Sequence, residues 1–297
     1  MRRTARILPA AMAASLLLTA CGLGRPSDDG RIEHPTGDET VLRVEHVGGF
    51  APVEFLFTGM PVFTLLGDGR VITQGAQIDI FPGPALPAVQ VRRLTEQGLQ
   101  AVLRAVADSG QFVGDAEWRG AQNFVADAGD TVFTLRAEGR EVTITVHALG
   151  AFLPGEGQPG VSGEELAAHE ALGTLLERLT MLETTLPATA WAEPTARDYV
   201  PDGLRLLVRN ADADPPDDSG IASTEIAWPL EGDPADFGQP ALDGYRCGAV
   251  TGADAGAWYE ALAAANQLTR WTGGGHRYQV TPRLLLPGEE LACPEPA

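Results

Sequence analysis

The feature that most constrains the fold is the alternation of apolar and polar residues over 141–147. Apolar side chains occupy every second position: Val142, Ile144 and Val146. A period of two is typical of a strand with one buried and one solvated face. A second β-rich segment, 131–136, precedes it across the short connection 137–140. The pattern therefore predicts a β-hairpin.

A second hairpin is predicted nearer the N-terminus. The segments 62–66 and 70–73 are rich in strand-forming residues, and Gly67-Asp68-Gly69 lies between them. An Asp-Gly pair suits a tight hairpin turn because glycine adopts a positive φ without a Cβ clash. Two hairpins in one segment of chain indicate an antiparallel sheet.

Two other segments have the 3.6-residue period of amphipathic helices. The first places Leu99, Val102 and Val106 on one face, and Thr95 is its predicted N-cap. The second begins at Ser162 with a capping-box spacing and continues through a leucine stripe. That stripe comprises Leu172, Leu175, Leu176, Leu179 and Leu182. The predicted fold class is α+β, with antiparallel sheets and amphipathic helices packed on one face.

We expect two domains, separated by a segment that prolines interrupt. Residues 187–202 lack periodicity and are predicted to form an extended Pro-rich linker. The linker follows an α+β domain over 40–186 and precedes a smaller α+β domain over 203–297. The segments 95–111 and 251–267 align without a gap and share an apolar frame, which suggests a weak internal repeat.

The N-terminal residues have the layout of an export signal. Residues 1–20 contain three arginines followed by an apolar stretch that is too short to span a bilayer as a permanent helix. They end in Leu18-Thr19-Ala20-Cys21, which resembles the lipobox of bacterial lipoproteins. The resemblance implies cleavage before Cys21 and lipid attachment to its thiol. Residues 21–39 lack apolar periodicity and are predicted to be a flexible tether.

The composition narrows the function further. The 21 basic residues against 40 acidic ones give a net charge of −19, and removal of residues 1–20 makes it −22. Such a charge disfavours binding to nucleic acid. All the basic residues are arginine, which excludes Schiff-base lysine chemistry and a P-loop. Absence of lysine with abundant Ala, Gly, Pro and Arg resembles uncharacterised lipoproteins exported by actinobacteria, a likeness that implies no activity.

Two cysteines remain in the exported part of the chain. Cys247 and Cys293 form an even pair, and outside the cytoplasm such a pair is most simply a disulfide. Neither belongs to a Cys-x-x-Cys motif, which argues against a redox pair. The predicted disulfide would join the C-terminal segment to the second domain.

An acidic segment is the one candidate metal site. Its carboxylates, Asp212, Asp214, Asp217 and Asp218, are hard oxygen ligands of the kind that Ca²⁺ prefers. Their spacing does not match an EF-hand, and two prolines stiffen the segment. A solvated acidic turn is the favoured interpretation, and calcium binding is the alternative.

Other motifs have structural explanations. Residues 155–160 match G-x-G-x-x-G, but the preceding strands are predicted as an antiparallel hairpin and nearby glutamates would repel a pyrophosphate. Ser162 is explained as a helix cap, and His147 as a hydrogen-bonded histidine on the polar strand face. Trp191 and Trp271 lie in predicted connections and are the tryptophans most expected to be exposed.

These observations predict a lipoprotein anchored in the cell membrane through Cys21, on the extracytoplasmic side, with a binding or structural role at the envelope. The membrane is its expected partner through the lipid, and an envelope protein or polymer is the further candidate. No cofactor and no catalytic residue is assigned, and a non-enzymatic role is favoured. The alternatives are an envelope hydrolase whose carboxylates are not identified and a calcium-dependent adhesion module.

Overall fold

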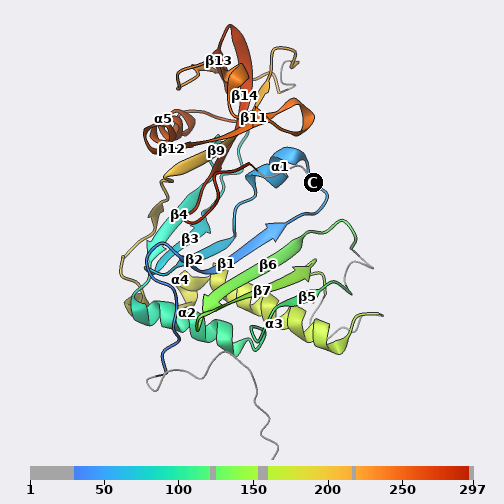
Figure 1. Ribbon diagram of the computed structural model, residues 1–297, viewed down its shortest axis with the longest axis vertical. Coiled ribbons are helices and arrows are strands. Elements are labelled where there is room, and N and C mark those ends of the chain that lie inside the picture. The colour runs from blue at the N-terminus through green and yellow to red at the C-terminus, as the bar shows by residue number, and fades with distance from the viewer. Residues whose placement is uncertain (1–29, 121–124, 153–159, 216–218, 294–297) are drawn as a thin grey trace, which may run out of the picture.

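The computed structural model describes residues 30–120, 125–152, 160–215 and 219–293 and shows two lobes (Figure 1). Each lobe contains one sheet, and helices pack against both sheets. Strands pair mainly antiparallel, although β5 runs parallel to β7 and β10 parallel to β13. The predicted α+β class is confirmed.

The first sheet has eight strands in the order β5-β7-β6-β1-β2-β3-β4-β8. Its strands are β1 (Thr40–Val47), β2 (Phe63–Leu66), β3 (Arg70–Gln74), β4 (Val89–Arg93), β5 (Ala116–Trp118), β6 (Asp130–Ala137), β7 (Arg140–His147) and β8 (Arg197–Asp198). Both predicted hairpins are confirmed as β2–β3 and β6–β7. The associated helices are α1 (Val53–Thr58), α2 (Glu96–Asp108), α3 (Gly163–Thr180) and α4 (Leu182–Thr185).

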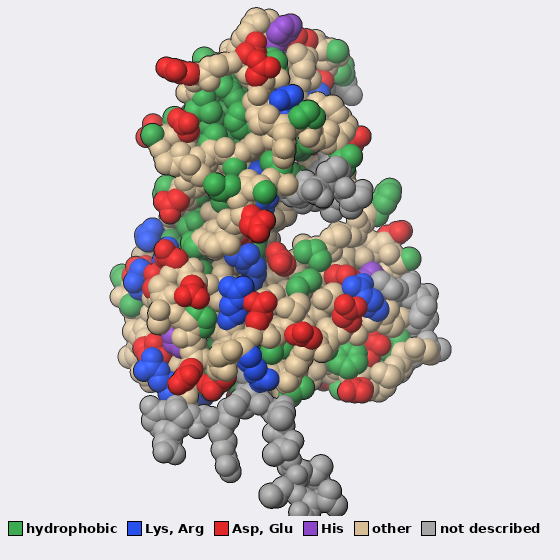
Figure 2. Space-filling view, in the orientation of Figure 1, with side chains coloured by type: hydrophobic (Ala, Val, Ile, Leu, Met, Phe, Trp, Pro, Cys, Tyr) green, Lys and Arg blue, Asp and Glu red, His purple; other side chains and the backbone are tan. Residues whose placement is uncertain are grey.

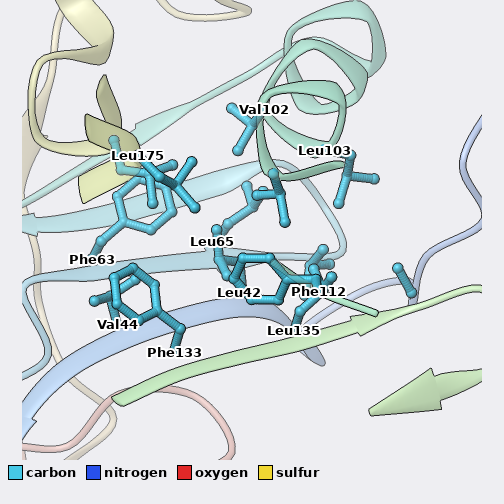
Figure 3. Close-up of a cluster of buried hydrophobic side chains, with 14 of the residues drawn as sticks. Leu42, Val44, Phe63, Leu65, Val102, Leu103, Phe112, Phe133, Leu135 and Leu175 are labelled. Atoms are coloured by element: carbon cyan, nitrogen blue, oxygen red, sulfur yellow. The ribbon is translucent and has the colours of Figure 1, made fainter. Parts of the chain in front are cut away.

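Helices α2 and α3 begin where their caps predict. The hydroxyl of Thr95 accepts a hydrogen bond from the Gly98 N–H, and that of Ser162 accepts one from the Glu165 N–H. Such caps satisfy N–H groups that have no partner within the helix. The apolar faces of both helices cover one face of the sheet and enclose its core (Figure 3). That core includes Leu42, Val44, Phe63, Leu65, Val102, Leu103, Phe112, Phe133, Leu135 and Leu175.

The second sheet has six strands in the order β10-β13-β14-β9-β12-β11. They are β9 (Gly203–Asn210), β10 (Glu225–Ala227), β11 (Gln239–Pro240), β12 (Arg246–Thr251), β13 (Arg270–Gly273) and β14 (His276–Leu284). Helix α5 (Gly252–Ala263) follows β12. The described part of the chain also contains the short 3₁₀ helices η2 (Ala188–Ala190), η3 (Pro234–Asp236) and η4 (Leu242–Gly244).

A shared apolar core joins the two lobes. Leu66, Ile72 and Val91, from the first sheet, pack with Leu204 and Trp258 of the second lobe. Strand β2 is therefore buried on both faces, whereas β4 buries Val89 and Val91 and leaves Gln90 on its other face exposed. The half of the sheet formed by β1, β6 and β7 keeps a polar face with half-buried side chains. The lobes cannot separate without exposing this apolar surface to water.

Two predicted segments differ from the structure. The tether was predicted to extend to residue 39, but Ile32 is already buried and exchanges two hydrogen bonds with the side chain of Gln100 on α2. The predicted linker 187–202 lies along the edge of the first sheet, because β8 pairs with β4 and Trp191 bridges to Leu94. Local composition does not show contacts with partners that are distant in the sequence.

The strand order also argues against the predicted repeat. In the first sheet, β1, β2 and β3 lie between the strand before α2 and the β6–β7 hairpin. In the second sheet, only β9 lies between the strand before α5 and the β13–β14 hairpin. In addition, Thr251 makes no side-chain cap, unlike Thr95. The two helices thus pack on differently ordered strands.

Candidate functional site at the junction of the lobes

Helix α1 leaves the first sheet and covers one face of the second. Phe57 packs in a buried cluster with Leu207, Tyr245 and Cys247. The Tyr245 hydroxyl donates a short hydrogen bond to the carboxylate of Glu54. Burial is the main cause that raises the pKa of Tyr245, to about 12. This face of the second sheet is therefore closed by a segment inserted between β1 and β2.

Beside α1, arginines from both lobes converge on one carboxylate. Arg283 donates two hydrogen bonds to Glu289, at 2.6 and 2.9 Å, and its Nε–H donates to the Gly59 carbonyl at 3.0 Å. Arg43 of β1 places a terminal nitrogen 3.6 Å from the same carboxylate. Arg205 lies directly opposite Arg283 on the neighbouring strand. Three guanidinium groups thus meet at the junction.

The charges of this cluster are not balanced. Arg205 donates to the backbone carbonyl of Glu290 at 2.7 Å. The charges of Glu289 and Glu290 act on it, but within the described part of the chain neither carboxylate forms a salt bridge with its guanidinium. The Nε atoms of Arg205 and Arg43 are buried without a hydrogen-bond partner among the described residues. Burial, and then the charge of Arg283, lowers the pKa of Arg205. Burial alone would raise the pKa of Glu289, but its hydrogen bonds with Arg283 lower it overall.

An opening lies between part of the first lobe and part of the second. Figure 2 shows it between the positions that α1 and β1 occupy in Figure 1. Leu42 and Val44 face the helix-covered core, so alternation places Arg43 and Glu45 on the opposite face of β1. The connection from β1 to α1 carries Phe50, of which 92% is exposed.

Sequence reasoning did not single out this cluster. Its signal is an arginine within an otherwise apolar strand: Arg205 between Leu204 and Leu206, and Arg283 directly before Leu284. Arginine is almost never fully buried unless it is paired, so these positions could have been marked. The carboxylate that Arg283 shares with Arg43 could not be marked, because Glu289 comes from the C-terminal segment and Arg43 from the other lobe.

The predicted disulfide lies close to the arginine cluster. Cys247 of β12 and Cys293 are bonded, with their Cα atoms 6.1 Å apart, which confirms the prediction. The bond holds the C-terminal segment that carries Glu289 and Glu290 against the second sheet. The predicted lipid attachment site, Cys21, lies outside the described residues.

The acidic segment has other partners in the structure. Asp212 accepts hydrogen bonds from the ring of His276 and the backbone N–H of Arg277. Asp214 forms a bidentate pair with Arg209 at 2.7 and 2.9 Å. The other predicted ligands, Asp217 and Asp218, lie outside the described residues, as does most of the G-x-G-x-x-G segment. Among the residues that the structure does describe, no group of three potential ligands is arranged to hold a metal.

His147 is hydrogen-bonded at both ring nitrogens. Nδ1 lies 2.8 Å from the Asp130 carboxylate, and Nε2 lies 2.8 Å from the Val125 carbonyl. Both ring nitrogens therefore lie within hydrogen-bond distance of a protein group, and the ring is held in place. His169 is also buried, which lowers its pKa, and its ring packs against Phe152 at 4.7 Å.

The remaining candidates lie apart from the junction. Trp271 was expected in an exposed connection but is buried within β13 against Trp258, because the connection is a strand. Trp191 is half-buried, and the guanidinium of Arg92 lies 4.1 Å from its ring centroid. An open hollow beside the β6–β7 turn is lined by several carboxylates, but Glu141 there is salt-bridged to an arginine at the surface.

Comparisons with protein-family models, with curated proteins and with solved structures find no match to this chain. None of the helices in the described ranges is long and apolar enough to cross a bilayer.

Proposed function

We propose that the protein is a membrane-anchored extracytoplasmic lipoprotein that binds a partner protein at the cell envelope. Anchoring is supported by the lipobox resemblance at Leu18-Thr19-Ala20-Cys21. The Cys247–Cys293 disulfide also supports an oxidising location, because such bonds are rare in the cytosol.

The observation that carries the binding role is a set of exposed apolar side chains between the end of β1 and the middle of α1. Exposure there is 40% for Val47, 92% for Phe50 and 70% for Phe55. Aromatic side chains supply much of the binding energy at protein interfaces, and large exposed apolar groups are uncommon on monomeric proteins. We call Val47, Phe50 and Phe55 the aromatic rim.

The charge around the aromatic rim indicates the kind of partner. Glu45 on β1 and Asp127 beside Phe50 lie next to it, and the exported chain has a net charge of −22. A partner with an apolar pocket edged by basic residues would complement this surface, and charge complementarity would accelerate its association. An acidic polymer would instead be repelled.

The test is chemical crosslinking of the lipidated protein in its native envelope, followed by mass spectrometry. The wild-type protein should yield a discrete partner that is lost with Phe50→Ser and with the unanchored Cys21→Ala form. Ile78→Ser is the matched control, since Ile78 is also exposed but lies on the β3–β4 connection. A crosslinking pattern that is the same in wild type and Phe50→Ser would refute the role of the aromatic rim.

A further inference from the structure

We propose that Arg43 and Arg205 form a binding site for a small oxyanion, bearing a carboxylate or phosphate group, at the junction of the two lobes. The proposal is independent of the aromatic rim and of the partner protein. It starts from an arrangement that is unfavourable by itself: Arg205 and Arg283 are direct cross-strand neighbours, and each is 8% exposed. Like charges directly opposite each other destabilise a sheet.

The carboxylate present neutralises only part of this charge. Glu289 pairs bidentately with Arg283, and its Oε2 also accepts the Leu286 N–H at 2.9 Å. Arg43 is left 3.6 Å from Glu289, beyond ordinary hydrogen-bond distance. Glu290, whose carbonyl accepts from Arg205, has an exposed side chain whose charge also acts on Arg205. Three arginines against these two carboxylates leave the cluster with excess positive charge in a strongly acidic protein.

Unused donors accompany the excess charge. Arg43 and Arg205 each have a buried Nε–H with no acceptor among the described residues. A buried donor without a partner loses the hydrogen bond that it would make with water, and the cost is larger for a charged group. A carboxylate or phosphate offers several acceptor oxygens in the geometry that a guanidinium matches. An oxyanion would thus supply both the missing charge and the missing acceptors.

The exposure of Arg43 and the net charge of the protein limit the kind of ligand that the site would bind. The side chain of Arg43 is 19% exposed and lies on the face of β1 that borders the opening in Figure 2. The hydrogen bond from Arg205 to the Glu290 carbonyl uses one of its donors and leaves its Nε–H without an acceptor among the described residues. A polyanion would be repelled by the net charge of −19. The site therefore suits a small free anion.

The test measures binding of inorganic phosphate and of succinate to the full lipidated chain in detergent micelles, by calorimetry and thermal melting at constant ionic strength. We expect saturable binding of at least one anion, with a matching rise in melting temperature. Arg43→Gln should weaken that binding roughly 10- to 100-fold, as expected for loss of a charge-assisted contact. Arg136→Gln is the matched control, because Arg136 lies on the neighbouring strand β6 and is exposed.

Two outcomes would overturn the proposal. One is the absence of saturable binding of either anion beyond the effect of sodium chloride. The other is equal affinity in wild type and Arg43→Gln. Because Arg205 is buried, Arg205→Lys supplies a second variant: it keeps the charge but lacks the planar fork. If that variant folds, it should bind more weakly than wild type, and unchanged affinity would exclude Arg205 from the site.

Discussion

Glu289→Gln should destabilise the protein strongly, and much more than a change of an exposed carboxylate. Glu289 accepts two hydrogen bonds from Arg283, accepts one from the Leu286 N–H and faces Arg43, and its side chain is only 8% exposed. Removing one partner of a buried ion pair costs about 3–5 kcal/mol because the other charge is left uncompensated. For a chain of this size, that loss lowers the melting temperature by roughly 6–20 °C.

Glu183→Gln is the matched control for this prediction. Glu183 also pairs with an arginine, Arg92, at 2.9 Å, but its side chain is 65% exposed. Exposed pairs contribute about 0–1 kcal/mol, so this variant should unfold close to wild type in urea. If both variants shift the unfolding midpoint equally, the burial argument is wrong.

The pH dependence of stability gives a second measure of the same group. The folded-state pKa of Glu289 is lowered, so its contribution is present above its unfolded pKa and is lost as pH falls through the folded value. The stability difference between wild type and Glu289→Gln should therefore be full near neutral pH and shrink as the solution becomes strongly acidic. A difference that grows on acidification would contradict this sign.

Three further predictions concern other parts of the chain. Reducing the disulfide, which closes a loop with a sequence separation of 46, should cost about 4 kcal/mol in the chain-entropy model, measured as the urea midpoint with and without reductant. Gly98→Ala should destabilise α2, because a Cβ at this position would lie 2.2 Å from the Ala190 carbonyl oxygen. Gly173→Ala in α3 places its Cβ in open space and should stabilise the protein by up to ~1 kcal/mol. Melting curves of the two variants and of the wild type test both expectations. If the segment 212–218 binds calcium, millimolar calcium should raise the melting temperature relative to chelator, and an unchanged value would refute that hypothesis.

Much of the secondary structure could be predicted because its signals are local. The alternation of Val142, Ile144 and Val146 predicts β7, and the hydroxyls of Thr95 and Ser162 mark the starts of α2 and α3. Periodicity and capping involve residues within a few positions of one another. The even pair of cysteines likewise predicted the disulfide.

The candidate site could not be predicted in this way. Arg43, Arg205 and Glu289 are far apart in sequence and belong to different elements, and nothing local distinguishes them from surface charges. The pairing of residues 197–198 with β4 was missed for the same reason. The proline-rich composition of residues 187–202 describes that segment itself and does not reveal the sheet edge on which it lies.

The sequence by itself determined the α+β class, the two hairpins, the capped helices and the disulfide, because each depends on residue types at short spacing or on a count of cysteines. Only the tertiary structure decided that β2 is buried on both faces and that arginines from two lobes share one carboxylate. The physical reason is that burial and charge balance depend on all neighbours in space. Chain folding brings those neighbours together from distant positions, and the local pattern does not record them.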